Sequence, residues 1–326
     1  MKIFSRKKTE NSREIFFFNT RILSYEKKHS ASYWKKIYDE KISRLQRTID
    51  DINSIHNSKI INVWQKDTPN QGDINCAPCL YFPELRKNAS YIDISHFPQS
   101  VEPRNKIIIV GGGGLFQEYF AKDMQKLYSL AEHNKLIIWA AGLDNYVGAT
   151  SQLPQISNAF KVGVRDYENG IHPYVPCASC MSTLFDQFRN TPEIHHVKLY
   201  IHGDYSQPIV RDLHHLPCLS NRQASSYHEI IKFMSNAEII LTNSYHGMYW
   251  ATLLGKKVIV LPWITKNNKI GFSEKFKTFK YQPVYCEKWL QYESYIKETT
   301  AYSQALNESR KANIEFFEDV KSVICK

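Results

Sequence analysis

The stretch from Glu238 to Pro262 constrains the fold of this chain more than any other. Ile239 to Thr242 is a short apolar, β-branched run that predicts a buried strand, and Val258 to Leu261 predicts a second one. Between them, Met248 to Leu254 is rich in helix-forming residues, and Gly255 follows where a helix would end. Strand, helix and strand in so short a stretch indicate a βαβ unit with two parallel strands.

The residues between the first of these strands and the helix form the first candidate site. They are Asn243, Ser244, Tyr245, His246 and Gly247. In open α/β sheets, ligands bind outside the carboxyl ends of the strands, and the N-terminus of a helix favours an anion. The sequence therefore predicts an anion site at this motif. The ordinary pKa of a histidine, about 6.5, would also let His246 donate a proton.

A second motif, Asn70-Gln71-Gly72-Asp73, follows the strand predicted from Ile60 to Trp64. Asparagine can orient a hydroxyl, glycine lets the backbone approach closely, and aspartate can accept a proton. A simple turn closed by an asparagine hydrogen bond is the structural alternative.

A run of four glycines, Gly111 to Gly114, directly follows the strand predicted from Ile107 to Val110. We expect Leu115 to His133 to be helical, so the glycines would pass from strand to helix. Their bare N–H groups could bind a phosphate, a carboxylate or a sugar hydroxyl. The run matches neither the Walker pattern nor the dinucleotide-binding pattern. A tight turn that lets strand and helix pack is the alternative.

Arg165 follows the strand predicted from Lys161 to Val164. At the carboxyl end of a strand, an arginine can hold a carboxylate or phosphate through two parallel hydrogen bonds. A structural ion pair with Asp166 is the alternative. The remaining predicted elements are strands at Tyr91 to Ile94, Leu136 to Ala140 and Val197 to Ile201, and helices at Tyr227 to Ser235 and Glu293 to Val323.

Together and in this order, these four motifs resemble the signature of the polysaccharide pyruvyl transferase family over roughly residues 60 to 265. The resemblance implies an α/β fold of two Rossmann-like domains facing a cleft, as in the GT-B arrangement of glycosyltransferases. It implies transfer of a pyruvyl group from phosphoenolpyruvate to a sugar of a cell-surface polysaccharide, such as an exopolysaccharide or capsule, or of its lipid-linked precursor. No metal or cofactor is needed. Many members carry an arginine two residues before the histidine, where this chain has Ser244.

Under this resemblance, Asp73 is the candidate base, and His246 is the candidate acid or ligand of the donor phosphate. The candidate substrate-binding residues are Asn70, Gly72, Gly111, Gly112, Gly113, Gly114, Arg165, Ser244, Tyr245 and Gly247. Two alternatives stay open. A glycosyltransferase that uses a nucleotide-activated sugar is favoured by the missing arginine. A non-catalytic glycan-binding or assembly subunit is disfavoured by the presence of Asp73, Arg165 and His246.

The predicted organisation is an N-terminal helical extension (1–57), an N-terminal α/β domain (58–190) and a C-terminal α/β domain with a terminal helix (191–326). Within Ala31 to Ile55, apolar residues recur at helical spacing: Tyr38, Ile42, Leu45, Ile49 and Ile52. We expect this stripe to pack on the first α/β domain. A coiled-coil dimer arm is the alternative.

Charge and hydropathy limit the compartment and the partners. Lysine and arginine number 42 against 32 aspartates and glutamates, a net charge of +10 that suits an anionic ligand or an anionic surface. The chain shows no nucleic-acid-binding motif, so we do not expect nucleic acid as a partner. Its first residues lack the apolar region of a signal peptide, and no apolar stretch has the length of a membrane span. We expect a cytoplasmic protein, with peripheral attraction to the inner face of the membrane as a further expectation.

The seven cysteines include two C-x-x-C pairs, Cys76 with Cys79 and Cys177 with Cys180. An odd number of cysteines favours a reducing compartment. A zinc site is the alternative that such pairs raise. About a hundred residues separate the pairs, far more than in a zinc ribbon, so we expect buried free thiols instead.

Overall fold

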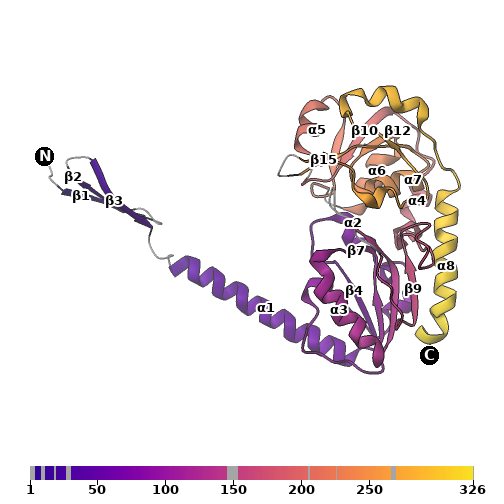
Figure 1. Cartoon of the computed structure of the whole chain (residues 1–326), viewed down its shortest axis with the longest axis horizontal. Coiled ribbons are helices and arrows are strands. Elements are labelled where there is room, and N and C mark those ends of the chain that lie inside the picture. Colours follow the sequence, from indigo (N-terminus) through magenta and orange to yellow (C-terminus); the bar gives the residue numbers. More distant parts are fainter. Residues whose placement is uncertain are drawn as a thin grey trace. The chain divides into compact units, whose positions relative to one another are not determined.

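The computed structural model describes residues 4–8, 12–17, 20–26, 31–144, 153–204, 206–224, 226–265 and 269–325. The protein has an α/β fold, as predicted, in which strands and helices alternate along most of the chain (Figure 1). The chain divides into two compact units, Met1–Asn53 and Ser54–Lys326.

The first unit contains a three-stranded antiparallel sheet, in the order β1-β2-β3, and most of helix α1 (Ala31–Asn57). The strands are β1 (Phe4–Lys8), β2 (Ser12–Phe17) and β3 (Thr20–Glu26). The expected helical extension over 1–57 therefore also contains strands.

Helix α1 confirms the helix predicted from Ala31 to Ile55. Four side chains of its apolar stripe are exposed: Tyr38, Ile42, Leu45 and Ile49. Packing of this stripe on the first α/β domain, and its coiled-coil alternative, stay predictions.

The second unit begins with a six-stranded parallel sheet. Its strands lie in the order β5-β4-β6-β8-β7, and β9 also pairs with β8. Their bounds are β4 (Ile60–Trp64), β5 (Ala89–Asp93), β6 (Ile107–Val110), β7 (Gly113–Phe116), β8 (Lys135–Leu143) and β9 (Lys161–Val164). Strands β4 and β6 are buried along their whole length, which explains their continuous apolar sequence.

A second parallel sheet, with the strand order β11-β10-β12-β13-β16, uses the later part of the chain. Its strands are β10 (His195–Ile201), β11 (Cys218–Ser220), β12 (Ala237–Thr242), β13 (Lys257–Val260) and β16 (Val284–Tyr285). A short antiparallel pair joins β14 (Trp263–Ile264) to β15 (Ile270–Gly271). The predicted domain boundary near residue 190 falls in the segment that precedes β10.

Helix α7 (Tyr245–Leu253) connects β12 to β13 and confirms the predicted βαβ unit. Every residue of this helix is buried, in keeping with its apolar composition on all sides. Its first residue is Tyr245, three residues earlier than predicted, and Ser244 is its N-terminal cap. Gly255 follows its end with φ +74°, a conformation that glycine adopts without strain.

The prediction of a helix from Leu115 to His133 is wrong at its start. The last two glycines of the run and the two apolar residues after them form β7, which pairs with β8. The helix itself, α3 (Ala121–Ser129), begins later. A short buried apolar run can be a strand or a helix by its pattern alone, and here pairing with β8 decides the outcome.

The other helices of the second unit are short, apart from the last. They are α2 (Gln71–Ile74), α4 (Leu184–Phe188), α5 (Gln207–Asp212), α6 (Tyr227–Ser235) and α8 (Ala305–Ile324). Single 3₁₀ segments are η1 (Pro78–Leu80), η2 (Pro83–Arg86), η3 (Ile94–His96), η4 (Glu118–Phe120), η5 (Leu130–Glu132), η6 (Ala178–Met181), η7 (Glu274–Phe276) and η8 (Trp289–Glu298). None of the described helices is both long and apolar enough to cross a membrane.

Helix α8 returns to the first parallel sheet and packs against it (Figure 1). The indole Nε1 of Trp139, in β8, donates a hydrogen bond to Asn313 Oδ1 at 2.9 Å. Asn313 Nδ2 donates in turn to the carbonyl of Pro176 at 3.0 Å, and Phe316 packs edge-on against Trp139. The helix predicted from Glu293 to Val323 is confirmed from Ala305 onward, whereas Trp289–Glu298 forms a 3₁₀ segment.

One hydrophobic core connects the two parallel sheets. It contains Ile60 and Trp139 from the first sheet, Trp250 from α7, Val260 from β13 of the second sheet, and Phe316 from α8. The residues that follow the carboxyl ends of both sets of strands are therefore held by one packed interior.

We expect Asn313→Ala to destabilise the protein by about 2 to 3 kcal/mol, because it leaves the Trp139 N–H and the Pro176 carbonyl buried without partners. Urea unfolding followed by tryptophan fluorescence measures this change. Asn307→Ala, on an exposed position of the same helix, is the matched control and should change stability little. Equal losses in the two variants would contradict the importance of this contact.

Candidate functional site

The first and last predicted motifs meet in space. Gly72, in α2 after β4, lies against His246, in the first turn of α7 after β12. A Cβ atom on Gly72 would lie 2.3 Å from His246 Nδ1, so any larger residue would collide with the imidazole ring. The missing side chain of Gly72 is what allows these two loops to come together.

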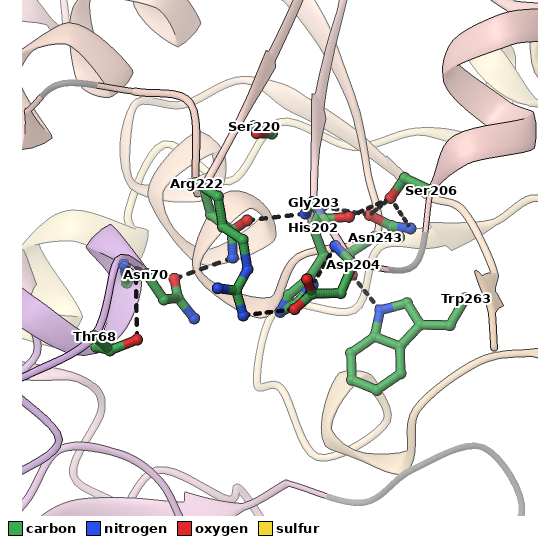
Figure 2. Close-up of polar contacts among 12 residues, drawn as sticks. Thr68, Asn70, His202, Gly203, Asp204, Ser206, Ser220, Arg222, Asn243 and Trp263 are labelled. Carbon is green, nitrogen blue, oxygen red and sulfur yellow. Dashed lines mark hydrogen bonds and ion pairs between the residues drawn. The ribbon is translucent and has the colours of Figure 1, made fainter. Parts of the chain in front are cut away.

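A hydrogen-bond network fixes the loop that carries Gly72. Asn70 caps α2: its Oδ1 accepts from the N–H of Gly72 at 3.0 Å, and its Nδ2 donates to Asp73 Oδ2 at 2.7 Å. Asn221, which follows β11, also donates to Asn70 Oδ1 at 3.1 Å. Figure 2 shows Asn70 pointing toward the loops that carry Arg222. Asn70 therefore has two roles. It closes the turn, as the structural alternative for this motif predicts, and it also orients the carboxyl group of Asp73.

Asp73 has an unusual carboxyl group. Its pKa is raised to about 6, first because surrounding protein atoms desolvate the carboxylate and second because Asp144 lies nearby. Lys275, Arg165 and the hydrogen bond from Asn70 act in the opposite direction. A carboxyl group with this pKa can both give and take a proton near neutral pH.

His246 differs from the expectation of an ordinary pKa. The residue is only 6% exposed, its Nε2 lies 3.6 Å from Cys177 Sγ, and its ring packs against Trp250. Burial lowers its pKa well below the usual value, and the positive charges of Arg165 and Lys275 add to this effect. The imidazole is therefore neutral at physiological pH and cannot serve as a cationic acid.

Arg165 points into the interior. It is 3% exposed, its guanidinium stacks on the ring of Tyr245 at 4.0 Å, and its Nη2 donates to the carbonyl of Leu143 at 3.0 Å. Among the described residues, its Nε has no hydrogen-bond acceptor. The neighbouring Asp166 instead accepts from the N–H of Leu143 and from the hydroxyl of Thr278. The alternative interpretation is a structural ion pair between Arg165 and Asp166. Each of the two charges does act on the pKa of the other, while the hydrogen bonds of both side chains go to other groups.

Close packing accounts for three of the four consecutive glycines. A Cβ atom would lie 1.9 Å from the carbonyl oxygen of Trp139 at Gly111, 2.7 Å from that of Cys76 at Gly112, and 2.4 Å from Asp144 Cβ at Gly114. At Gly113, the positive φ of +85° favours glycine. The structure thus requires glycine at all four positions for packing or backbone conformation. A binding role for these residues stays a prediction.

The residues next to His246 have mainly structural roles. Ser244 accepts a hydrogen bond from the N–H of Gly247 at 3.3 Å and so caps α7. Tyr245 supports Arg165. A Cβ atom on Gly247 would collide with Tyr200 and with the hydroxyl of Thr242.

A pocket of about 230 Å³ opens beside Asp73. Its lining comes from both halves of the second unit: Gln65, Thr68, Asn70, Asp73, Gln117, Tyr119, Phe120, Asp144, His202, Asp204, Arg222, Trp263 and Lys275. Of the described site residues predicted from sequence, this lining contains Asn70 and Asp73. Arg165, His246 and the glycines are not part of this lining.

Lys275 is a pocket residue that is not among the candidate site residues predicted from the sequence. Its side chain is 7% exposed, its Nζ lies 2.5 Å from Asp144 Oδ1, and it lies 4.4 Å above the ring of Trp263. Burial lowers the pKa of Lys275, whereas Asp144 raises it. In the sequence, Lys275 belongs to a basic segment that resembles an exposed surface, so no local pattern distinguishes it.

His202, Asp204 and Arg222 form the opposite part of the lining. Burial lowers the pKa of His202 to about 4, and Lys275 adds to this effect, so its imidazole is also neutral. Arg222 donates to Asp204 at 2.6 Å, and Figure 2 shows the two side chains facing each other. His202 directly follows β10 and Asp144 directly follows β8. Their strand-end positions are the signal that could have identified them.

Two cysteines lie next to the site. Cys76 Sγ donates to the carbonyl of Asp73 at 2.9 Å, and Cys177 lies against His246. Both thiols are fully buried, and burial raises the pKa of each. In the described part of the chain, no group of three or more histidine, cysteine, aspartate or glutamate side chains is arranged to hold a metal ion.

Neither a protein-family model nor a curated protein matches this chain. Among solved structures, it is similar to an uncharacterized protein from Klebsiella pneumoniae subsp. pneumoniae. The two share 17% sequence identity over 67% of this chain and 88% of the other, with a TM-score of 0.39. A similarity of this size transfers no function.

The raised pKa of Asp73 has a consequence for stability. The folded state holds this proton more tightly than the unfolded chain, whose pKa is near 3.8. The stabilising contribution is full below pH 3.8 and is lost as pH rises through about 6. Asp73→Asn mimics the protonated form. We therefore expect it to raise the free energy of unfolding by about 1 to 2 kcal/mol at pH 7.5 and by much less at pH 4.5.

Urea unfolding of the wild type and Asp73→Asn at the two pH values measures this difference. Asp39→Asn, at an exposed position of α1, is the control. If Asp73→Asn lowers stability equally at both pH values, the carboxylate is not desolvated as described.

Proposed function

We propose that this protein transfers a pyruvyl group from phosphoenolpyruvate to two hydroxyls of a sugar, in a cell-surface polysaccharide or its precursor. The proposal combines the resemblance of the four motifs with the position of the pocket, which is lined by residues after strands of both parallel sheets. It includes two Rossmann-like domains in a GT-B-like arrangement, with this pocket as the cleft.

The observation that carries the proposal is Asp73, a carboxyl group with a pKa of about 6 that lines a pocket also containing the buried cation Lys275. Pyruvyl transfer needs both features: a group that exchanges protons near neutral pH, and a positive charge for an anionic donor.

The volume of the pocket favours a small donor. At about 230 Å³ it lies below the range of roughly 300 to 1,000 Å³ that is common for larger ligands. Phosphoenolpyruvate is a small anion, whereas a nucleotide-activated sugar has a base, a ribose, phosphates and a second sugar to accommodate. The acceptor sugar would approach from the open side of the pocket.

The reaction has two bond-forming steps at one carbon. A proton adds to the methylene carbon of the enol, which becomes a methyl group and leaves positive charge on the neighbouring carbon. An acceptor hydroxyl oxygen bonds to that carbon and loses its proton. A second hydroxyl oxygen of the same sugar then bonds to it as phosphate leaves with the electron pair of the broken C–O bond and takes the second proton. The products are a cyclic ketal and inorganic phosphate.

Asp73 can perform both proton transfers of the first step. In its protonated form it donates to the methylene carbon, and the resulting carboxylate accepts the proton of the attacking hydroxyl. A bound anionic donor favours the protonated form further. This assignment gives Asp73 the role of acid as well as base, because the neutral His246 cannot act as a cationic acid. His246 instead supports the backbone of Gly72.

Ser244, in the place of an arginine, favours a second candidate function, a glycosyltransferase that uses a nucleotide-activated sugar. Release of phosphate from phosphoenolpyruvate in the presence of sugar acceptors, measured beside release of nucleotide from nucleotide-activated sugars, separates the two candidates. Nucleotide release without phosphate release would overturn pyruvyl transfer. A cytoplasmic location with attraction to the inner face of the membrane fits the net charge of +10 and a lipid-linked acceptor.

We expect kcat/KM for phosphoenolpyruvate to fall as pH rises through about 6, because the free enzyme must start with Asp73 protonated. Asp73→Asn should lower kcat by about a hundredfold or more while the donor still binds, since the amide cannot exchange a proton. Phosphate-release kinetics between pH 5 and 8, corrected for the titration of phosphoenolpyruvate itself, provide the measurement. A rate that rises with pH over this range would make Asp73 a base alone.

A further inference from the structure

Lys275 is a cation that the fold buries at considerable cost. Its side chain is 7% exposed, although an ammonium group loses strong hydration when it leaves water. A lysine is retained in such a place when partners or ligands compensate for the lost hydration. Its position on the 3₁₀ segment η7 presents it to the pocket.

The protein compensates for this charge incompletely. The ammonium group has three donors, and Asp144, at 2.5 Å, is its hydrogen-bond acceptor among the described residues. The ring of Trp263, 4.4 Å away, stabilises the cation from one side. Lys275 therefore retains capacity for an anion on the side that faces the pocket.

The other cations near the pocket are less suited to an anion. Arg165 is not part of the lining, and its guanidinium donates to the carbonyl of Leu143. Arg222 lies at the surface, 39% exposed, and is paired with Asp204. Histidines 202 and 246 are neutral, because burial and the charge of Lys275 lower the pKa of each.

We infer that Lys275 binds the phosphate of the donor and supplies the positive charge that Ser244 does not provide, with Asp144 as the positioning residue that holds the ammonium group in the pocket. The assignment rests on the proposed function for the identity of the donor. The binding of a phosphate at Lys275 stands by itself.

The inference explains how an anion can approach Asp73. With the phosphate at Lys275, the ammonium group lies between two negative charges, and Asp73 is favoured in its protonated form. When the phosphate leaves, Lys275 stabilises the charge that develops on the leaving oxygen.

The test compares Lys275→Met and Lys275→Arg with Lys277→Met, a control two residues along the chain whose side chain is 60% exposed. Calorimetric titration with inorganic phosphate and with phosphoenolpyruvate measures binding without turnover. We expect Lys275→Met to weaken both by about tenfold to a hundredfold, the usual range for a lost charge-assisted hydrogen bond. Lys275→Arg should retain part of the affinity, and Lys277→Met should bind like the wild type.

Lys275→Met leaves Asp144 without its partner and could fail to fold. The double variant Lys275→Met/Asp144→Asn removes one positive and one negative charge and so leaves the net charge of the pocket unchanged. Wild-type phosphate affinity in either variant, or an absence of phosphate binding in the wild type, would overturn the inference.

A pH profile separates binding from a structural role. The groups that act on the pKa of Asp73 are Asp144, Lys275, Arg165 and Asn70, and Lys275 lowers it. In Lys275→Met, the fall of kcat/KM should therefore move to higher pH together with a raised KM. Turnover of phosphoenolpyruvate with an unchanged KM and an unchanged profile would refute the role of Lys275 while leaving the proposed function intact. Phosphate binding that depends on Lys275, without turnover of phosphoenolpyruvate, would refute the proposed function and leave the phosphate site at Lys275 intact.

Discussion

The contact between Gly72 and His246 is the constraint on which the site depends. Helices α2 and α7, each following a strand of a different parallel sheet, can meet because Gly72 has no side chain at the point of contact. The common core fixes both helices, and the cap residues Asn70 and Ser244 fix their conformation. The pocket beside Asp73 is a consequence of this arrangement, because its lining is drawn from both sides of the contact.

The electrostatics of the site follow from burial more than from the number of charges. Desolvation disfavours every charged form in this region, so the two histidines are neutral and Asp73 titrates near pH 6. Lys275, in contrast, is stabilised in its charged form by an ion pair with Asp144. Under the proposed function, such a site would exchange protons through the carboxyl group of Asp73 and bind an anion through the amine of Lys275, whereas the residue types alone suggest His246 as the acid.

The sequence predicted what local pattern determines. The βαβ unit around α7, the strands β4, β6 and β9, and the helix α6 all follow from local sequence patterns. The glycine run was harder, because pairing with β8 turned Leu115 and Phe116 into a strand. Lys275 could not be found in this way, since its partner Asp144 lies 131 residues away. The neutral state of His246 also depends on neighbours from distant segments.

Helix α8 is synthesised long after the sheet against which it packs, so it can dock only when translation is nearly complete. Trp139 emerges 174 residues before Asn313, which is its hydrogen-bond partner in the finished structure. At about 5 to 20 residues per second, a ribosome needs roughly 10 to 35 seconds to make that length of chain. For this interval one side of the first sheet exposes its aromatic surface to solvent or to a chaperone. The nascent chain therefore passes through a state that is vulnerable to aggregation until its last helix docks.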